Sequence, residues 1–178
     1  MSITLHTNLG DIKIELFCEL TPKTAKNFLG LIASGYYDNT IFHRLIRDFI
    51  VQGGSNKHRI DNNKDKDNKE KAGKDKNIYG KQYFEDEIVD SLKFNQRGCV
   101  AMANKGANTN SSQFFITFKA QPQLNNTATI FGKVIHGYNT LDAMEKSEVD
   151  NKNRPSEPIK ILSTTIHANP IADKEMND

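Results

Sequence analysis

Short apolar runs separated by turn residues recur along the sequence, and this pattern limits the fold more than any other feature. The first two runs, residues 3–7 and 11–17, alternate apolar and polar side chains around Asn8-Leu9-Gly10, which predicts a β-hairpin. Similar runs predict further strands at 41–46, 49–53, 98–103, 113–118, 129–135 and 158–167. So many short strands favour a closed or nearly closed antiparallel barrel.

Two helices are predicted between these strands. Thr21 is a suitable N-cap, Pro22 suits the first helical position, and Gly35 follows as a stop signal. The apolar residues at helical spacing in between are Ala25, Phe28, Leu29 and Ile32. Residues 138–146 predict a second, shorter helix. The fold is therefore predicted to be mainly β.

Length and composition favour a single domain. The chain has 178 residues, and 37% of them are hydrophobic, which suffices for one ordinary core. We expect one domain over residues 1–170 and a short polar tail over 171–178. No apolar run could span a membrane and the amino terminus lacks a signal-peptide pattern, so we expect an intracellular protein. Cys18 and Cys99 are expected to be reduced thiols.

A charged segment, residues 56–77, interrupts the succession of strands. It contains seven Lys and one Arg against four Asp and one Glu. This composition cannot bury enough apolar surface to offset the entropy of ordering, so a disordered insertion is predicted. A calcium loop is excluded because Lys66 and Ala72 stand where the turn glycine and the bidentate glutamate belong. RNA contact stays open as a weaker alternative, because acids are interspersed and no aromatic residue is present to stack on bases.

Several kinds of chemistry find no support in the residue pattern. The five histidines lack the spacing of a zinc site, and neither a nucleophile elbow nor a phosphate-binding glycine loop is present. The three acids of residues 84–87 (FEDE) more often form a solvated edge or a helix-capping cluster than a catalytic pair. Metal-dependent and hydrolytic functions are therefore not expected.

Polar side chains beside apolar runs are the remaining candidates for function. Arg44 and Gln52 lie near Phe42 and Phe49, while Asn104, Asn108, Asn110 and Gln113 lead into Phe114-Phe115. Taken singly, an arginine beside a phenylalanine is usually a surface residue, and such a phenylalanine pair is usually core. Their joint occurrence favours a site that binds and positions a ligand without breaking bonds.

Several segments together resemble the cyclophilins, a family of peptidyl-prolyl cis-trans isomerases. They are IFHRLIRDFIVQGG (41–54), IYGKQYFEDE (78–87), MANKGANTNSSQFFITF (102–118) and IFGKVIHG (130–137). The resemblance extends from the first strand to about residue 170 and is interrupted by the charged insertion. The two ends of the chain resemble the peptidyl-prolyl isomerase-like 3 branch, which is associated with the spliceosome.

The resemblance implies a closed eight-stranded antiparallel barrel capped by two α-helices, with a shallow groove on its outer face. It implies that Arg44 is the catalytic residue, that Phe114 belongs to the core, and that the substrate is bound by Phe49, Ile50, Gln52, Ala103, Asn104, Gln113, Phe115 and Leu124. The expected ligands are proline-containing peptides or proteins, possible partners are spliceosomal proteins, and no cofactor or metal is implied. A monomer without membrane or direct nucleic-acid binding is expected, and the resemblance implies that it is located in the nucleus, the cytoplasm or both.

Three positions depart from the family pattern. Ile50 stands where a methionine is usual, Gln123 where the archetypal members have a tryptophan, and Ala128 where they have a histidine. Weak cyclosporin binding and a more open proline pocket are therefore expected.

Two functional classes follow from this resemblance. As an isomerase, the protein would turn an Xaa-Pro bond, whose nitrogen becomes pyramidal and basic when the amide is twisted, so that a hydrogen-bond donor at that nitrogen stabilises the transition state. As an alternative, it would be a proline-peptide binding module of a nuclear ribonucleoprotein with little catalysis. Arg44 favours the isomerase, because a pure binding module does not need a donor for a pyramidal nitrogen.

Overall fold

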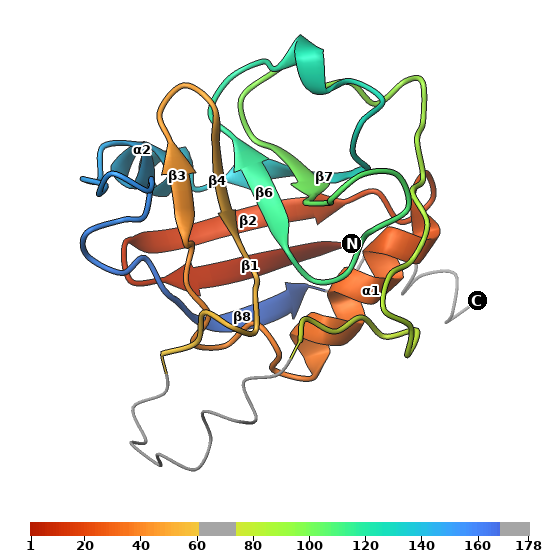
Figure 1. Ribbon diagram of the computed structural model, residues 1–178, viewed down its shortest axis with the longest axis horizontal. Coiled ribbons are helices and arrows are strands. Elements are labelled where there is room, and N and C mark those ends of the chain that lie inside the picture. Colours follow the sequence, from red (N-terminus) through yellow and green to blue (C-terminus); the bar gives the residue numbers. More distant parts are fainter. Residues whose placement is uncertain (61–73, 168–178) are drawn as a thin grey trace.

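Eight antiparallel strands form one strongly curled sheet in the computed structural model, which describes residues 1–60 and 74–167 (Figure 1). The sheet order is β3-β4-β6-β5-β7-β2-β1-β8. The strands are β1 (Ser2–Thr7), β2 (Gly10–Leu16), β3 (Arg44–Ile46), β4 (Ile50–Gly53), β5 (Cys99–Met102), β6 (Phe114–Thr117), β7 (Ile130–His136) and β8 (Ile161–His167). The prediction of a mainly β fold with eight antiparallel strands is confirmed.

The two edges of this half-barrel are joined by loop contacts. Ile41 forms an isolated bridge with Lys160, and the Phe42 N–H donates to the Ile159 carbonyl over 2.9 Å. These pairings explain why β3 starts only at Arg44 and not at residue 41 as predicted. Residues 41 and 42 pair with the chain that leads into β8, whereas the residues from Arg44 onward pair with β4.

Both predicted helices are present, as α1 (Pro22–Ala33) and α2 (Tyr138–Glu145), together with a short 3-10 helix, η2 (Pro122–Leu124), that the sequence pattern did not indicate. Helix α1 packs against β7 and β8, and α2 packs against β2. The predicted stop at Gly35 is confirmed. This residue has a φ of +75° and its N–H donates to the Ile32 carbonyl over 3.0 Å.

The start of α1 differs from the prediction. Thr21 occupies the N-cap position, but its hydroxyl donates backwards to the Phe17 carbonyl and does not cap the helix. The carboxylate of Glu87 does so from a distant loop. It accepts from the Lys23 N–H over 3.2 Å, and from the N–H and hydroxyl of Thr24 over 2.6 and 2.7 Å. The interpretation of the FEDE acids as a helix-capping cluster therefore holds for Glu87.

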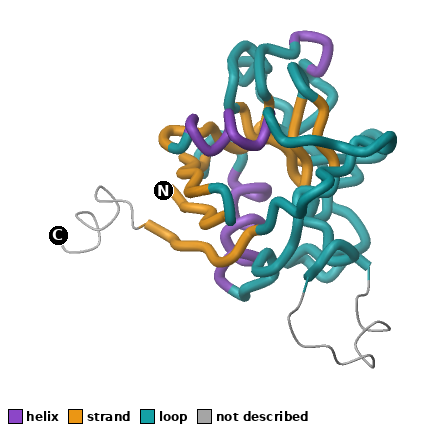
Figure 2. The backbone as a smooth tube through the Cα atoms, turned by 90° about the vertical axis from the view of Figure 1, so that its left-hand side faces the viewer, coloured by secondary structure: helices purple, strands orange, loops and turns teal. Residues whose placement is uncertain are grey.

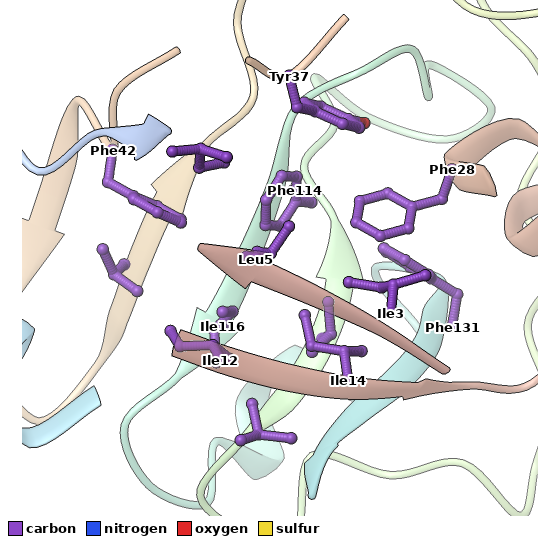
Figure 3. Close-up of a cluster of buried hydrophobic side chains, with 14 of the residues drawn as sticks. Ile3, Leu5, Ile12, Ile14, Phe28, Tyr37, Phe42, Phe114, Ile116 and Phe131 are labelled. Atoms are coloured by element: carbon purple, nitrogen blue, oxygen red, sulfur yellow. The ribbon is translucent and has the colours of Figure 1, made fainter. Parts of the chain in front are cut away.

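Alternation along the strands places two apolar clusters on opposite faces of the sheet. The inner cluster fills the half-barrel, where Phe28 of α1 contacts the rings of Tyr37, Phe114 and Phe131 at centroid distances of 5.0–5.3 Å. Figure 3 shows these side chains pointing toward one another. The outer cluster consists mainly of the alternate residues of β4, β5, β6 and β7. A side view shows the strands gathered together, with long loops covering much of the rest of the molecule (Figure 2).

The charged segment is described only at its two ends, 56–60 and 74–77. Both ends hold defined positions, because Asn56 and Asn77 are buried and Asp75 accepts hydrogen bonds. These ends do not match the expectation of a disordered insertion, and the rest of it, residues 61–73, lies outside the described residues, as does the predicted tail at 171–178. Among the described residues, no helix is long and apolar enough to cross a membrane.

His43 and His58 stack where the charged segment meets the chain that leads into β3. Their ring centroids lie 4.4 Å apart with an interplanar angle of 16°. Burial lowers the pKa of His43 from 6.5 to about 4, and the charges of His58, Arg154 and Arg44 act in the same direction, whereas Asp75 opposes them. The folded protein therefore favours the neutral imidazole of His43.

Replacement of Glu87 by alanine should lower the free energy of unfolding by about 1–3 kcal/mol, because the orphan amides at the start of α1 lose a charged acceptor. Chemical denaturation measures this loss. The matched control is Glu85→Ala, which removes an exposed carboxylate that pairs with the Lys23 side chain at the surface and should change the stability little. Equal effects of the two substitutions would contradict the assignment of Glu87 as the cap.

The stability of the protein should fall as the pH is lowered from about 6.5 to about 4. In this range the unfolded chain binds a proton at His43 that the folded protein does not bind, so stability rises with pH. The variant His43→Phe should flatten this dependence, leaving a smaller slope from His58, whose pKa is also lowered by burial. Denaturant midpoints measured between about pH 4 and pH 6.5 test this prediction. The control is His136→Phe, which replaces a histidine at an exposed position. An unchanged slope in His43→Phe would contradict the assignment.

Candidate active site

Strand register brings the predicted polar and apolar residues to one outer face. Arg44 of β3 lies opposite Gln52 of β4, and Gln52 lies opposite Phe115 of β6. Because neighbouring residues of a strand point to opposite faces, Phe114 points into the inner core, where it is completely buried, and Phe115 points outward. The assignment of Phe114 to the core is confirmed.

Three polar side chains form a hydrogen-bonded row across these strands. The Arg44 Nη1 lies 3.5 Å from the Gln52 Oε1, at the long limit of a hydrogen bond. The Gln52 Nε2 donates to the Gln113 Oε1 over 2.9 Å. Arg44 is exposed, whereas both glutamines are half-buried. The guanidinium therefore lies beside this face in an exposed position, and it carries more N–H donors than one Gln52 oxygen can accept from.

The predicted apolar residues gather in the outer cluster. Ile50 and Phe115 are only 3% and 6% exposed and form its floor, while Phe49, Ala103 and Leu124 are half-buried around them. These five residues come from four separate stretches of the chain. Together with the polar row, they make a face with an apolar part and a cationic border.

Several members of the outer cluster were not predicted as site residues, and Phe94 and Cys99 are two of them. Phe94 lies in the polar stretch KFNQRG and is 1% exposed, and its ring stacks on that of Phe115 at a centroid distance of 5.8 Å. Cys99 also belongs to the cluster, and burial raises the pKa of its thiol, so it is suited to packing and not to nucleophilic attack. A lone aromatic residue among polar neighbours has no periodicity that could have marked Phe94 as part of a site.

The loop after β5 is fixed by its own side chains. Asn104 donates to the Thr127 carbonyl over 2.9 Å and accepts from the Gly106 N–H over 3.1 Å. Asp86 of the FEDE segment accepts from the Asn108 N–H and from the side chain of Asn110. The two bonds of Asn104 use one N–H group and one lone pair of its side chain, and they fix the position of this residue beside the site.

A cavity of about 300 Å³ adjoins this face. Gln52, Ala103, Asn104 and Gln113 contribute to its wall, so four of the predicted site residues border it, and Ala103 belongs to both the cavity and the apolar cluster. The wall also includes Lys57, Lys74, Lys105 and Asp75. The two ends of the charged segment thus reach the site.

The departures from the family pattern lie at the rim and within the cluster. Ala128 is 7% exposed and packs into the outer cluster. Gln123 is exposed on η2, next to Leu124, and its amide donates to the Gln121 side chain over 2.6 Å.

The described residues contain no group of three or more His, Cys, Asp or Glu side chains that could hold a metal ion. The face offers hydrogen-bond donors and apolar contact for a ligand.

Comparisons with known proteins identify one family along nearly the whole chain. The family model of the cyclophilin type peptidyl-prolyl cis-trans isomerase/CLD matches residues 2–166. A peptidyl-prolyl cis-trans isomerase from Arabidopsis thaliana is 56% identical over 97% of this chain and 99% of its own. The human peptidyl-prolyl cis-trans isomerase-like 3 is 53% identical over 97% of this chain and 99% of its own.

A solved structure extends this likeness to three dimensions. The cyclophilin type peptidyl-prolyl cis-trans isomerase of Cryptosporidium parvum, crystallised in the presence of the dipeptide Ala-Pro, superposes with a TM-score of 0.82 at 44% identity. The match covers 95% of this chain and all of the other. The chain therefore belongs to the cyclophilin-type peptidyl-prolyl cis-trans isomerases.

Proposed function

We propose that the protein accelerates rotation about Xaa-Pro bonds by a hydrogen bond from Arg44 to the pyramidal nitrogen of the proline. The observation that supports this most directly is the row of Arg44, Gln52 and Gln113 along the border of the outer apolar cluster. A guanidinium is always charged and presents several N–H groups in one plane, so its donors do not depend on pH. The reaction needs no bond to break.

One hydrogen bond does not suffice for this reaction. The barrier to rotation is about 18–20 kcal/mol, because the twisted bond loses amide resonance. A charge-assisted hydrogen bond contributes roughly 1.5–3 kcal/mol, whereas an acceleration of about 10⁵ needs about 7 kcal/mol. Other parts of the site must therefore supply more than half of the stabilisation.

The apolar cluster and the site's polar groups would provide the rest. Phe115 and Ile50 form a floor on which a proline ring can lie, and Phe49, Ala103 and Leu124 surround it, which removes water from the amide. Gln52 and Asn104 would hold the peptide on one side of the proline, so that only the other side turns. The neighbouring cavity would receive a further part of the peptide.

Two finer assignments belong to the same proposal. We propose a role within a spliceosomal assembly, which is supported by identities of 50–56% to peptidyl-prolyl cis-trans isomerase-like 3 proteins and other relatives over nearly the whole chain. We also propose weak binding of cyclosporin, because an exposed Gln123 beside Leu124 offers less apolar surface than the tryptophan implied by the family pattern. Co-purification with spliceosomal proteins from nuclear extract tests the first of these.

The variant Arg44→Ala should lower kcat/KM for an Xaa-Pro peptide by about tenfold to a hundredfold, in line with the loss of one charge-assisted hydrogen bond. Exchange NMR spectroscopy on a short peptide measures the rate of cis-trans interconversion directly. Arg47→Ala is the matched control, because Arg47 lies in the same hairpin but donates to the main chain of residues 145 and 146 at the end of α2.

The same experiment separates the two functional classes. An isomerase should raise the exchange rate of the peptide, and the rate should fall in Arg44→Ala but not in Arg47→Ala. A proline-peptide binding module would bind the peptide without raising the rate, and an unchanged rate in Arg44→Ala would remove this residue from its proposed role.

The variant Gln123→Trp should bind cyclosporin more tightly than the natural protein, by about tenfold or more, because an indole adds apolar area and one N–H donor. The chain contains no tryptophan, so the fluorescence of the new residue reports binding without background. Calorimetry of the natural protein and of Gln123→Ala provides the comparison. Equal affinity of all three proteins would contradict the role assigned to this position.

A further inference from the structure

The polar row beside the apolar cluster continues beyond Gln113 to a carboxylate. The Gln113 Nε2 donates to the Asp75 Oδ2 over 2.8 Å. The complete row thus runs from Arg44 through Gln52 and Gln113 to Asp75. Asp75 comes from the end of the charged segment, far from the other three in the sequence.

The ends of the row determine the direction of every hydrogen bond in it. A guanidinium can only donate and a carboxylate can only accept. A glutamine amide accepts through its oxygen and donates through its NH2 group, and by turning over it can present either group to a given neighbour. Both glutamines therefore have to accept on the side of Arg44 and donate on the side of Asp75. Their observed orientations satisfy this condition at both positions.

The second carboxylate oxygen of Asp75 is also hydrogen-bonded within the protein. This atom, Oδ1, accepts from the Ser55 hydroxyl over 3.0 Å and from the Asn56 N–H over 2.9 Å, which leaves Oδ2 for Gln113. A main-chain N–H cannot change from donor to acceptor. The carboxylate is therefore fixed in place and presents an acceptor to Gln113.

We propose that Asp75 is a positioning residue for catalysis, which acts by orienting the amides of Gln113 and Gln52 so that an oxygen faces Arg44. This inference rests on the function proposed above for Arg44. Asp75 does not need to touch the substrate for this role. It acts through two glutamines on the orientation of a third side chain, the guanidinium.

Exchange of the Asp75 carboxylate for an amide should reverse the direction of the hydrogen bonds along the row. In Asp75→Asn the oxygen stays with the Asn56 N–H, so the NH2 group faces the NH2 group of Gln113. Gln113 must then turn over, and Gln52 must follow. The row would end with the NH2 group of Gln52 facing the N–H groups of Arg44, which repel it. Arg44 would lose its partner although no atom of the site has been removed.

A second substitution should restore the original direction. In the double variant Asp75→Asn, Gln113→Glu the carboxylate lies one step closer to Arg44. There it accepts from the new amide at position 75 on one side and from Gln52 on the other. Gln52 then keeps its original orientation. The single variant Gln113→Glu should be impaired, because it places two carboxylates face to face.

The test measures kcat and KM by exchange NMR at several peptide concentrations for the natural protein, both single variants and the double variant. We expect kcat to fall about tenfold in each single variant with a smaller change in KM. In the double variant kcat should recover, whereas KM should not recover fully, because Gln113 is also an expected substrate-binding residue. Asp90→Asn, the same exchange at an exposed position, is the control and should leave both constants unchanged. If Asp75 only holds residues 55 and 56, Gln113→Glu will not rescue Asp75→Asn, and this result would overturn the proposal.

A readout that does not depend on activity separates this proposal from the proposed function. The side-chain NH2 resonances of Gln52 and Gln113 should both shift in Asp75→Asn, and those of Gln52 should return in the double variant. If the natural protein shows no isomerase activity, the proposed function fails, but these resonances still test the direction of the row. Unchanged Gln52 resonances in Asp75→Asn would overturn the inference about Asp75.

Discussion

The pairing of β4 with β6 is the constraint on which both the core and the site depend. Gln52 lies opposite Phe115, and Gly53 lies opposite Phe114. A shift of this register by one residue would turn Phe114 out of the core and Phe115 into it, because side chains alternate between the two faces of a strand. The same pairing places Gln52 between Arg44 and Gln113. Core packing therefore stabilises the arrangement that catalysis is proposed to use.

Long loops complete the site, and the structure ties them to the core. The FEDE segment has two roles here: Glu87 caps α1, and Asp86 holds the loop that contains Asn108 and Asn110. Phe94 reaches the outer cluster from a third loop and supports the ring of Phe115. Each of these contacts joins residues far apart in the chain. The outer face is thus built on paired strands on one side and held by specific hydrogen bonds on the loop side.

The sequence predicted what depends on local pattern. Period-two alternation located β1 and β2, and short apolar runs between turn residues located the later strands. The motif match separated Phe114 from Phe115 and assigned both Arg44 and Gln52 to the groove. Contacts between distant segments were not predictable in this way. The capping of α1 by Glu87 replaced a local prediction for Thr21, and the pairing of Ile41 with Lys160 shortened β3. Asp75 was missed because its neighbours in the sequence are charged and polar, while its partners Ser55, Asn56 and Gln113 are brought to it only by the fold.

The central claim is that the outer face bordered by Arg44 is where an Xaa-Pro bond is bound and turned. A crystal structure of the protein with a bound Xaa-Pro peptide tests this most directly. The account predicts that the proline ring lies on Phe115, with an Arg44 nitrogen within about 2.7–3.2 Å of the Xaa-Pro amide. A peptide bound elsewhere, or bound on this face with Arg44 turned away from the amide, would contradict it.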